Sequence, residues 1–249
     1  YGNMVTITDE VKQSDLANTY SLTDGLLETS ARRVTQYVYN GDYGSNKVKF
    51  GAYYGGSSKR NIKNVDLKNN RKNTWGTGLI FNHEIDSIQN VTVAAGFTRQ
   101  ISENANKTAY YSNAYALGLA YNFVHTTYGL DLAHKDTKNK GGAGNKVKNN
   151  EVTAVIRQGL NEDWNVYAMY SYKTEKTLPV GSAYSKSTDR QFLVGTEYYV
   201  FKQGSVKVKP FIEWQATRTK YENTFDKDSG KQLDRSRDFK TVIGLRAYW

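Results

Sequence analysis

Apolar and polar residues alternate one by one over many stretches of the chain, and helical periodicity is hard to find. In the stretch 206–217, one parity holds Val206, Val208, Ile212, Trp214 and Ala216, and the other holds Lys207, Lys209, Glu213, Gln215 and Thr217. Stretches 47–56, 151–160 and 164–175 divide in the same way. Successive side chains of a strand point to opposite faces, so this pattern predicts strands with one apolar and one polar face.

We expect about twelve such strands, separated by turn signals. They are predicted at Asn3–Glu10, Ala31–Asn40, Lys47–Gly56, Thr74–Asn82, Val91–Ile101, Ala109–Phe123, Thr126–Lys135, Glu151–Leu160, Trp164–Glu175, Gln191–Phe201, Val206–Lys220 and Phe239–Trp249. The segment Val11–Ser30 is the least regular part, with some helical character. It is expected to form a loop or to lie inward from the sheet.

Short connections alternate with long polar ones along the chain. The short ones are "NGDYGSN", "NHEIDSIQN", "NFVHTT", "LNEDW" and "FKQGS"; the long ones run at about Ser57–Asn73, Ser102–Thr108, Asp136–Asn149, Lys176–Arg190 and Tyr221–Asp238. Outer-membrane barrels have an even number of antiparallel strands, short periplasmic turns and long extracellular loops. The sequence therefore predicts one all-β domain over residues 1–249, a transmembrane antiparallel β-barrel of the bacterial outer membrane.

Three features favour lipid outside this sheet over a soluble barrel, which the alternation alone also permits. Aromatic residues end the apolar faces: Tyr54, Trp75, Tyr121, Phe123, Tyr128, Trp164, Tyr198, Trp214 and Trp249. Small residues line the polar face: Gly51, Gly76, Gly78, Gly96, Ala116, Gly118, Gly129, Gly159, Gly195 and Gly244. The ending "IGLRAYW" resembles the aromatic terminal signal of many bacterial barrels.

Composition narrows the chemistry further. The 249 residues include no cysteine, which excludes disulfides and thiol nucleophiles, and no metal-ligand spacing is present, so no cofactor is expected. No run of about 18 apolar residues exists, and the start "YGNMVTITDE" lacks the pattern of a secretory signal, so a mature form is expected. The formal charge of +10 indicates a polyanionic partner. No nucleic-acid recognition motif accompanies it.

Basic residues outnumber acidic ones on the polar face, which would line the lumen. The bases are Arg33, Lys47, Lys49, Lys135, Arg157, Lys173, Lys207, Lys209, Lys240 and Arg246; the acids are Asp131, Glu151, Glu175, Glu197 and Glu213. Six of the bases (Lys47, Lys49, Arg157, Lys207, Lys209 and Arg246) fall near the short turns and predict a positive collar that favours anions. Alternatively, the bases pair with the acids across neighbouring strands.

Tyr37, Tyr53, Tyr167 and Tyr199 are also assigned to the polar face, where their rings could stack on sugars. The candidate solute contacts are Arg33, Lys47, Lys49, Tyr53, Arg157, Tyr167, Lys173, Tyr199, Lys207, Lys209, Lys240 and Arg246. Together they predict a monomeric channel for small anionic solutes, above all acidic oligosaccharides such as oligouronates. The basic loops "SSKRNIKNVDLKNNRKN" and "KDTKNKGGAGNKVKNN" are expected to contact outer-membrane lipid and lipopolysaccharide, or to funnel anions.

Three stretches bear on a known family: "VKPFIEW" (Val208–Trp214), "DRSRDFKTVIGLRAYW" (residues 234–249) and "YAMYSYKTEK" (Tyr167–Lys176). They resemble the penultimate strand, the closing strand and a tyrosine-rich strand of the oligogalacturonate-specific porins (KdgM type), which include sialic-acid channels. The resemblance covers about the last third of the chain. It implies an outer-membrane sugar-acid channel, with basic lumen residues at Lys207, Lys209, Lys240 and Arg246.

The sequence leaves two other functions to consider, a barrel enzyme and an autotransporter translocator. A barrel enzyme would need a histidine paired with an acid or a hydroxyl nucleophile at the outer rim. His83 and His125 fall in predicted turns, and His134 has Asp136 nearby but no serine partner, so no enzyme activity is expected. An autotransporter translocator also has twelve strands, with a helix in its pore. The position of residues 11–30 would separate that alternative from a channel.

Overall fold

Long antiparallel strands make up most of the computed structural model, which describes residues 3–16, 25–57, 70–103, 109–139, 146–178, 184–223 and 232–248. The strands of the main sheet are β3 (Val34–Tyr43), β4 (Asn46–Gly55), β5 (Asn70–Asp86), β6 (Gln89–Glu103), β7 (Ala109–Phe123), β8 (Thr126–Asn139), β9 (Lys146–Gly159), β10 (Trp164–Leu178), β11 (Ser185–Tyr198), β12 (Phe201–Gln203), β13 (Val206–Asn223) and β14 (Gln232–Tyr248). About half of the residues in the predicted long loops, and Trp249, lie outside the described residues. Most of the other loop residues belong to strands that are longer than predicted: β11 begins at Ser185 and β14 at Gln232.

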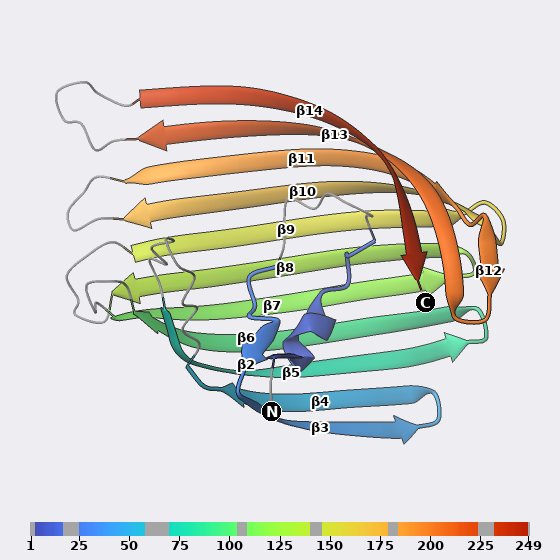
Figure 1. Ribbon diagram of the computed structural model, residues 1–249, viewed down its shortest axis with the longest axis horizontal. Coiled ribbons are helices and arrows are strands. Elements are labelled where there is room, and N and C mark those ends of the chain that lie inside the picture. Colours follow the sequence, from blue (N-terminus) through green and yellow to red (C-terminus); the bar gives the residue numbers. More distant parts are fainter. Residues whose placement is uncertain are drawn as a thin grey trace.

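The strands form one curved meander, in which each long strand pairs with the next along the chain (Figure 1). Near its end, β11 and the short β12 both pair with β13, and β14 pairs with the other side of β13. The main sheet has twelve strands. Eleven of them correspond to predicted strands, and the short β12 makes up the number in place of the predicted Asn3–Glu10. Its antiparallel all-β architecture confirms the predicted fold class.

The tight turns all lie at one end of the sheet, on the right in Figure 1, and the long connections leave from the other. We call these the short-turn end and the long-loop end. Gly44 and Gly204 occupy two of the tight turns with φ of 71° and 60°, a conformation that suits glycine. The predicted segregation of short and long connections is confirmed.

The predicted first strand, Asn3–Glu10, is wrong. Only Asn3–Val5 is a strand (β1), and it pairs with β2 (Ser30–Arg32) apart from the main sheet. The chain then forms the 3₁₀ helix η1 (Ile7–Val11). The predicted strand is only eight residues long. Over so short a stretch, the alternation of apolar and polar residues does not distinguish a strand from a short helix with apolar residues four positions apart, as Ile7 and Val11 are.

The predicted strand Ala31–Asn40 is broken at one residue. Arg33 has a φ of 51°, which is uncommon for a residue other than glycine and separates β2 from β3. At this point the chain passes from the interior into the wall of the sheet. Arg33 is exposed there and does not belong to the polar face to which it was assigned.

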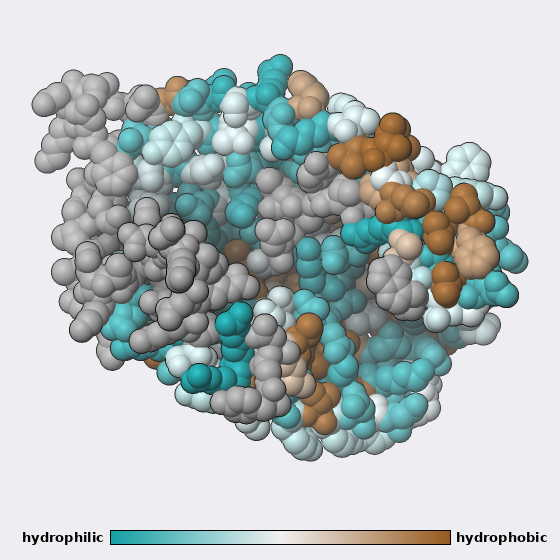
Figure 2. Space-filling model, in the orientation of Figure 1, coloured by the Kyte–Doolittle hydropathy of each residue, from teal (hydrophilic) through white to brown (hydrophobic). Residues whose placement is uncertain are grey.

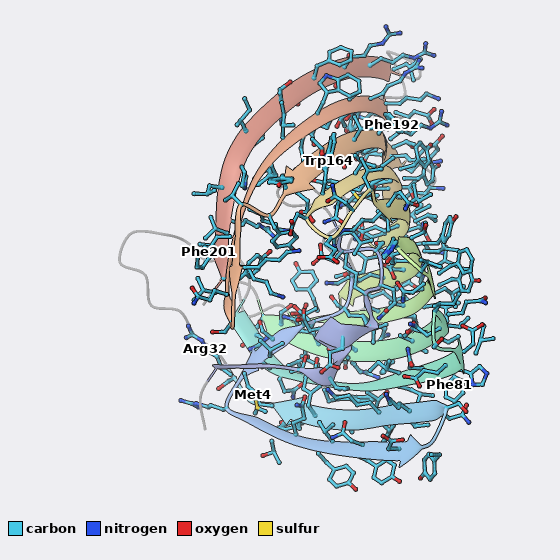
Figure 3. All side chains as sticks on the ribbon, turned by 90° about the vertical axis from the view of Figure 1, so that its right-hand side faces the viewer. Met4, Arg32, Phe81, Trp164, Phe192 and Phe201 are labelled. Atoms are coloured by element: carbon cyan, nitrogen blue, oxygen red, sulfur yellow. The ribbon has the colours of Figure 1, made fainter. Side chains whose placement is uncertain are left out.

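Exposure alternates along the strands in the predicted sense. Ile212 and Trp214 are 42% and 39% exposed, whereas Glu213 between them is 1% exposed. The apolar parity lies on the convex face, where Figure 3 shows Phe81 and Phe192 pointing away from the enclosed space. The polar parity lies on the concave face, so the predicted face assignment is confirmed for these strands.

The main sheet has two edge strands, β3 and β14. The ladders of the described residues join every neighbour between them but do not join β14 to β3. Most of β14 is exposed on both faces, as expected for an edge. In hydrocarbon, the free backbone groups of such edges must find partners. No helix of the described residues is long and apolar enough to cross a membrane.

Candidate functional site: the concave face and the segment that crosses it

Residues 3–16 and 25–32, which we call the lumen segment, lie against the concave face (Figures 1 and 3). The wall beneath them is a row of small residues. Gly51, Gly78 and Gly96 lie directly opposite one another on β4, β5 and β6. An added Cβ at Gly51 would lie 2.8 Å from Ile7, and one at Gly96 would lie 2.9 Å from Val11. The glycines therefore make room for the lumen segment.

The lumen segment crosses the strands, and Asp131 on β8 fixes its far end. The backbone amides of Gln13 and Ser14 donate to the two Asp131 carboxylate oxygens, each at 2.8 Å, and the Ser14 hydroxyl donates to the same carboxylate. At the other end, the Ile7 amide donates to the Gln36 side-chain oxygen at 2.8 Å. These bonds satisfy backbone donors that no strand ladder serves.

The second leg of the lumen segment is held through the backbone of Glu28. Its carbonyl accepts hydrogen bonds from the hydroxyls of Thr6 (3.2 Å), Thr8 (2.7 Å) and Tyr53 (3.1 Å). The Glu28 carboxylate lies 3.5 Å from the Lys135 ammonium. Both legs are thus bonded to each other and to the wall.

A cavity remains between the lumen segment and strands β7 to β9. Its lining includes four carboxylates (Asp9, Asp15, Asp131 and Glu151) and Lys12. Burial, together with the neighbouring Asp15 and Glu10 carboxylates, raises the pKa of Asp9 above its usual value. Figure 2 shows hydrophilic side chains around the hollow of the concave side. This part of the interior is acidic, with apolar side chains such as Leu26, Leu27 and Leu132 between the charged groups.

Most of the predicted lumen bases have a carboxylate partner. The pairs are Lys47–Glu84 (3.2 Å), Lys49–Glu10 (2.5 Å), Lys135–Glu28 (3.5 Å), Arg157–Glu197, Lys173–Glu151 (3.3 Å), Lys209–Glu197 (2.5 Å) and Lys240–Asp238 (2.9 Å). Four of these acids, Glu10, Glu28, Glu84 and Asp238, were not counted from the sequence. The predicted surplus of positive charge is therefore reduced by pairing, as the alternative anticipated.

Part of the predicted collar does assemble at the short-turn end. The Glu197 carboxylate, 1% exposed, binds both Arg157 and the 5% exposed Lys209. Arg246 lies opposite Lys209 in the β13–β14 ladder, and Lys207 is exposed at the rim. Lys47 and Lys49, in contrast, lie on β4, near the other edge of the sheet. Four of the six predicted collar bases are brought together, and two are not.

The tyrosines offer less sugar-binding surface than predicted. Tyr53 and Tyr167 face inward, but each is 4% exposed, and the Tyr167 hydroxyl donates to Glu213 at 2.7 Å. Tyr37 was assigned to the wrong face: it lies opposite Ala52 on the convex side and is 65% exposed. Tyr199 is at the mouth, where the ammonium groups of Lys202 and Lys209 lie 4.5 and 5.5 Å from its ring centroid.

The role of Asp131 and the anchors Ile7 and Val11 are not predicted from the sequence. The signal for them is present in the glycines of the polar face, which a narrow lumen also explains. Glycines at matching heights on neighbouring strands indicate that another backbone lies against the sheet. Together with the weak strand pattern of residues 11–30, they point to an internal segment.

Among the described residues, the histidines form no recognisable catalytic group. On β8, the His134 ring bonds to Asn150 at 2.7 Å and lies 3.3 Å from Asp136. His83 bonds to Asn46 at 2.9 Å beside a tight turn. Within the described residues, no cluster of three or more acids or histidines could hold a metal ion. The expectation that the protein is not an enzyme stays a prediction.

Comparison with known proteins identifies the fold. No protein-family model and no curated protein matches the chain. Among solved structures, the chain is similar to OmpT, an outer membrane protein of Vibrio cholerae. Outer-membrane-expressed OmpT has a TM-score of 0.65 at 16% identity, with 100% of this chain and 76% of that chain covered. In-vitro folded OmpT in its trimer form gives 0.63 at 14% identity, covering 100% and 76%.

A loop L8 deletion mutant of the same protein gives a TM-score of 0.62 at 16% identity and covers 100% of this chain and 74% of that chain. At such identities the likeness bears on the fold, and it agrees with the predicted localisation in the outer membrane of a bacterium. No match supports the oligogalacturonate-specific family in particular. The chain has the fold of the outer-membrane β-barrels.

Proposed function

We propose that this protein forms the wall of a water-filled diffusion channel in the outer membrane, narrowed by the lumen segment. The observation that carries the proposal is the pairing of an apolar convex face with a concave face that holds hydroxyls, amides and ion pairs around a cavity with four carboxylates. Such a surface favours small hydrophilic solutes, because it offers water and solute the hydrogen bonds that hydrocarbon lacks.

We also propose that the channel favours anionic solutes, with acidic oligosaccharides such as oligouronates as its substrates. Arg157, Lys207, Lys209 and Arg246 at the short-turn end support this preference, as does the porin resemblance of the last third of the chain. The acidic cavity opposes it, and the ion pairs weaken it. The expected preference is therefore moderate, with attraction concentrated at the mouth.

The test is conductance of the refolded protein in a planar bilayer with a salt gradient. A channel with a reversal potential that favours anions supports both parts of the proposal. Cation selectivity would leave the channel and remove the anion preference, and absence of conductance would contradict the channel itself. A liposome-swelling comparison of acidic and neutral oligosaccharides of matched length then tests the substrate class.

The autotransporter alternative gains one observation, since the lumen segment lies inside the arc of the sheet. However, η1 and the residues after it cross β4 to β8 instead of running along them, which does not suit a helix threading a pore. An epitope tag placed before residue 3 distinguishes the two ideas. Its cleavage by protease on intact cells would favour the translocator, and its protection would favour the channel.

A further inference from the structure

Three arginines form a row on the convex face near the long-loop end. Arg190 on β11 lies directly opposite Arg218 on β13, which lies directly opposite Arg237 on β14. All three are exposed. Directly opposite residues of an antiparallel pair have Cβ atoms about 4.5–5.5 Å apart, and like charges in such pairs repel. The row therefore costs free energy unless an anion lies against it.

The surrounding surface supplies little negative charge. The convex parity of β10 to β14 beyond the arginine row adds Lys176, Lys186, Lys220 and Arg235. The described residues of this area include one carboxylate on the same face, that of Glu222, which pairs with Lys220. Arg190 has an aromatic neighbour, the Tyr172 ring, whose centroid is 5.8 Å from its guanidinium carbon.

An apolar groove adjoins the row on its side nearer the middle of the strands. Tyr170, Phe192, Ala216 and Phe239 lie directly opposite one another on β10, β11, β13 and β14. The small Ala216 between two phenylalanines leaves a shallow groove, which the three arginines also line. Phe192 points outward from the arc in Figure 3, and Phe239 stacks on Trp214 with ring centroids 6.2 Å apart.

We propose that this surface is a binding site for a phosphorylated, acylated lipid of the outer leaflet. The headgroup phosphate lies across Arg190, Arg218 and Arg237, and an acyl chain lies in the groove over Ala216. Guanidinium groups bind phosphate through two parallel N–H donors, which makes arginine well suited to this headgroup. Aromatic residues beside the arginines mark the boundary between hydrocarbon and headgroups.

The long-loop end faces outward in barrels of this kind, which places the site in the outer leaflet. A free phosphate ion would use the arginines but leave the groove empty, so the groove favours a lipid. The proposed lipid site depends on the position of the sheet in the membrane, and it does not depend on whether the protein forms an ion-conducting channel. An experiment can therefore contradict the lipid site without contradicting the channel, and the reverse also holds.

The test is native mass spectrometry of the refolded full chain in neutral detergent, titrated with diphosphoryl lipid A. The triple variant R190Q/R218Q/R237Q should bind the lipid at least about tenfold more weakly than the parent chain, because charge-assisted bonds to phosphate are lost. The matched control R99Q/K138Q/K148Q removes three charges from the convex parity of β6, β8 and β9 and should bind like the parent chain. Folding is checked by the heat-dependent gel mobility of each variant.

Two further experiments test the acyl-chain groove and the phosphate contacts separately. The variant Ala216→Trp fills the groove and should also weaken binding, whereas R190K/R218K/R237K should fall between the parent chain and the glutamine triple. Lipid A without phosphates should bind no better to the parent chain than to the glutamine triple. If the triple fails to fold, Arg218→Gln alone should weaken binding about threefold.

The site is overturned if the glutamine triple and the control triple bind lipid equally well, or if dephosphorylated lipid binds as tightly as lipid A. Displacement of lipid A by inorganic phosphate at equal concentration would also overturn it, because the arginines would then be a free-anion site. Loss of binding in the arginine triple alone, with phosphate dependence, establishes it.

Discussion

Strands β4 to β8 and strands β9 to β14 fill the interior in different ways. The first wall is lined by Gly51, Gly78 and Gly96, and the space is occupied by a second stretch of backbone, the lumen segment. The second wall fills the same depth with its own side chains, including the buried Tyr167, Met169 and Leu193. Two of its glycines make room for aromatic rings: the Tyr167 ring lies over Gly195 and the Phe211 ring over Gly244. The lumen segment therefore fills the space along β4 to β8, whereas along β9 to β14 the strands' own side chains fill most of it and the segment adds Leu16 to their cluster.

The largest expected loss of stability comes from a substitution in strands β9 to β14, at Glu197. Replacing Glu197 with alanine leaves Arg157 and the buried Lys209 without their shared carboxylate. Uncompensated buried charge costs about 3–5 kcal/mol, so we expect a loss of that size in the free energy of unfolding. Urea unfolding of the refolded protein measures it. The control is Asp238→Ala, which breaks the exposed pair with Lys240 and should cost about 0–1 kcal/mol; equal losses would mean that burial of the cluster does not matter.

The next largest effect is expected from removing Asp131, the residue that anchors the lumen segment. Asp131→Ala removes the acceptor of two backbone amides and the Ser14 hydroxyl. Hydrogen bonds to charged groups contribute about 1.5–3 kcal/mol each. This loss falls on the lumen segment, which should detach while the sheet persists, so the free energy of unfolding of the sheet should change less than in Glu197→Ala. Limited proteolysis should then cut within residues 3–16, and channel conductance should rise. Protection equal to that of the parent chain would show that the contacts at the wall glycines and the bonds of Ile7 and Glu28 hold the segment without Asp131.

A smaller loss is expected from filling the wall itself. In Gly96→Leu, the new Cβ would lie 2.7 Å from Leu27 and 2.9 Å from Val11. Overpacking costs about 1–3 kcal/mol, and the lumen segment can relieve it by moving away. Proteolysis of residues 3–16 should therefore quicken. Ala95→Leu, one position along on the convex face, is the matched control and should leave the segment protected.

The smallest effect on stability is expected from a substitution at Lys207, at the short-turn end of β13. Lys207→Glu at this exposed position should change the free energy of unfolding by no more than about 0.5 kcal/mol. The reversal potential should nevertheless shift towards cations, because the charge at the mouth is inverted. Lys209→Glu is not an equivalent change, since it would place a second carboxylate beside Glu197 and destabilise the fold. An unchanged reversal potential for Lys207→Glu would remove the mouth from the selectivity mechanism.

The sequence was sufficient for the sheet and insufficient for its interior. Alternation reports which parity is polar, so the faces of strands such as 206–217 were predicted correctly. It does not report register, and register decides that Glu197 lies between Arg157 and Lys209. Nor does it show that Glu10 comes from a distant part of the chain to meet Lys49. Tyr37 was misassigned because the break at Arg33 resets the parity of the strand that follows.

The anchoring of the lumen segment also has a consequence for the order of folding. The hydrogen bond between Gln13 and Asp131 joins residues 118 positions apart in the chain. Contacts of such sequence separation form slowly, because the intervening chain must first be ordered. The carboxylate of Asp131 can accept the hydrogen bonds of the lumen segment only after strands β4 to β8 have paired. In refolding kinetics, strand formation should therefore precede protection of residues 3–16 from hydrogen exchange. The lumen segment is expected to dock only after the sheet has formed.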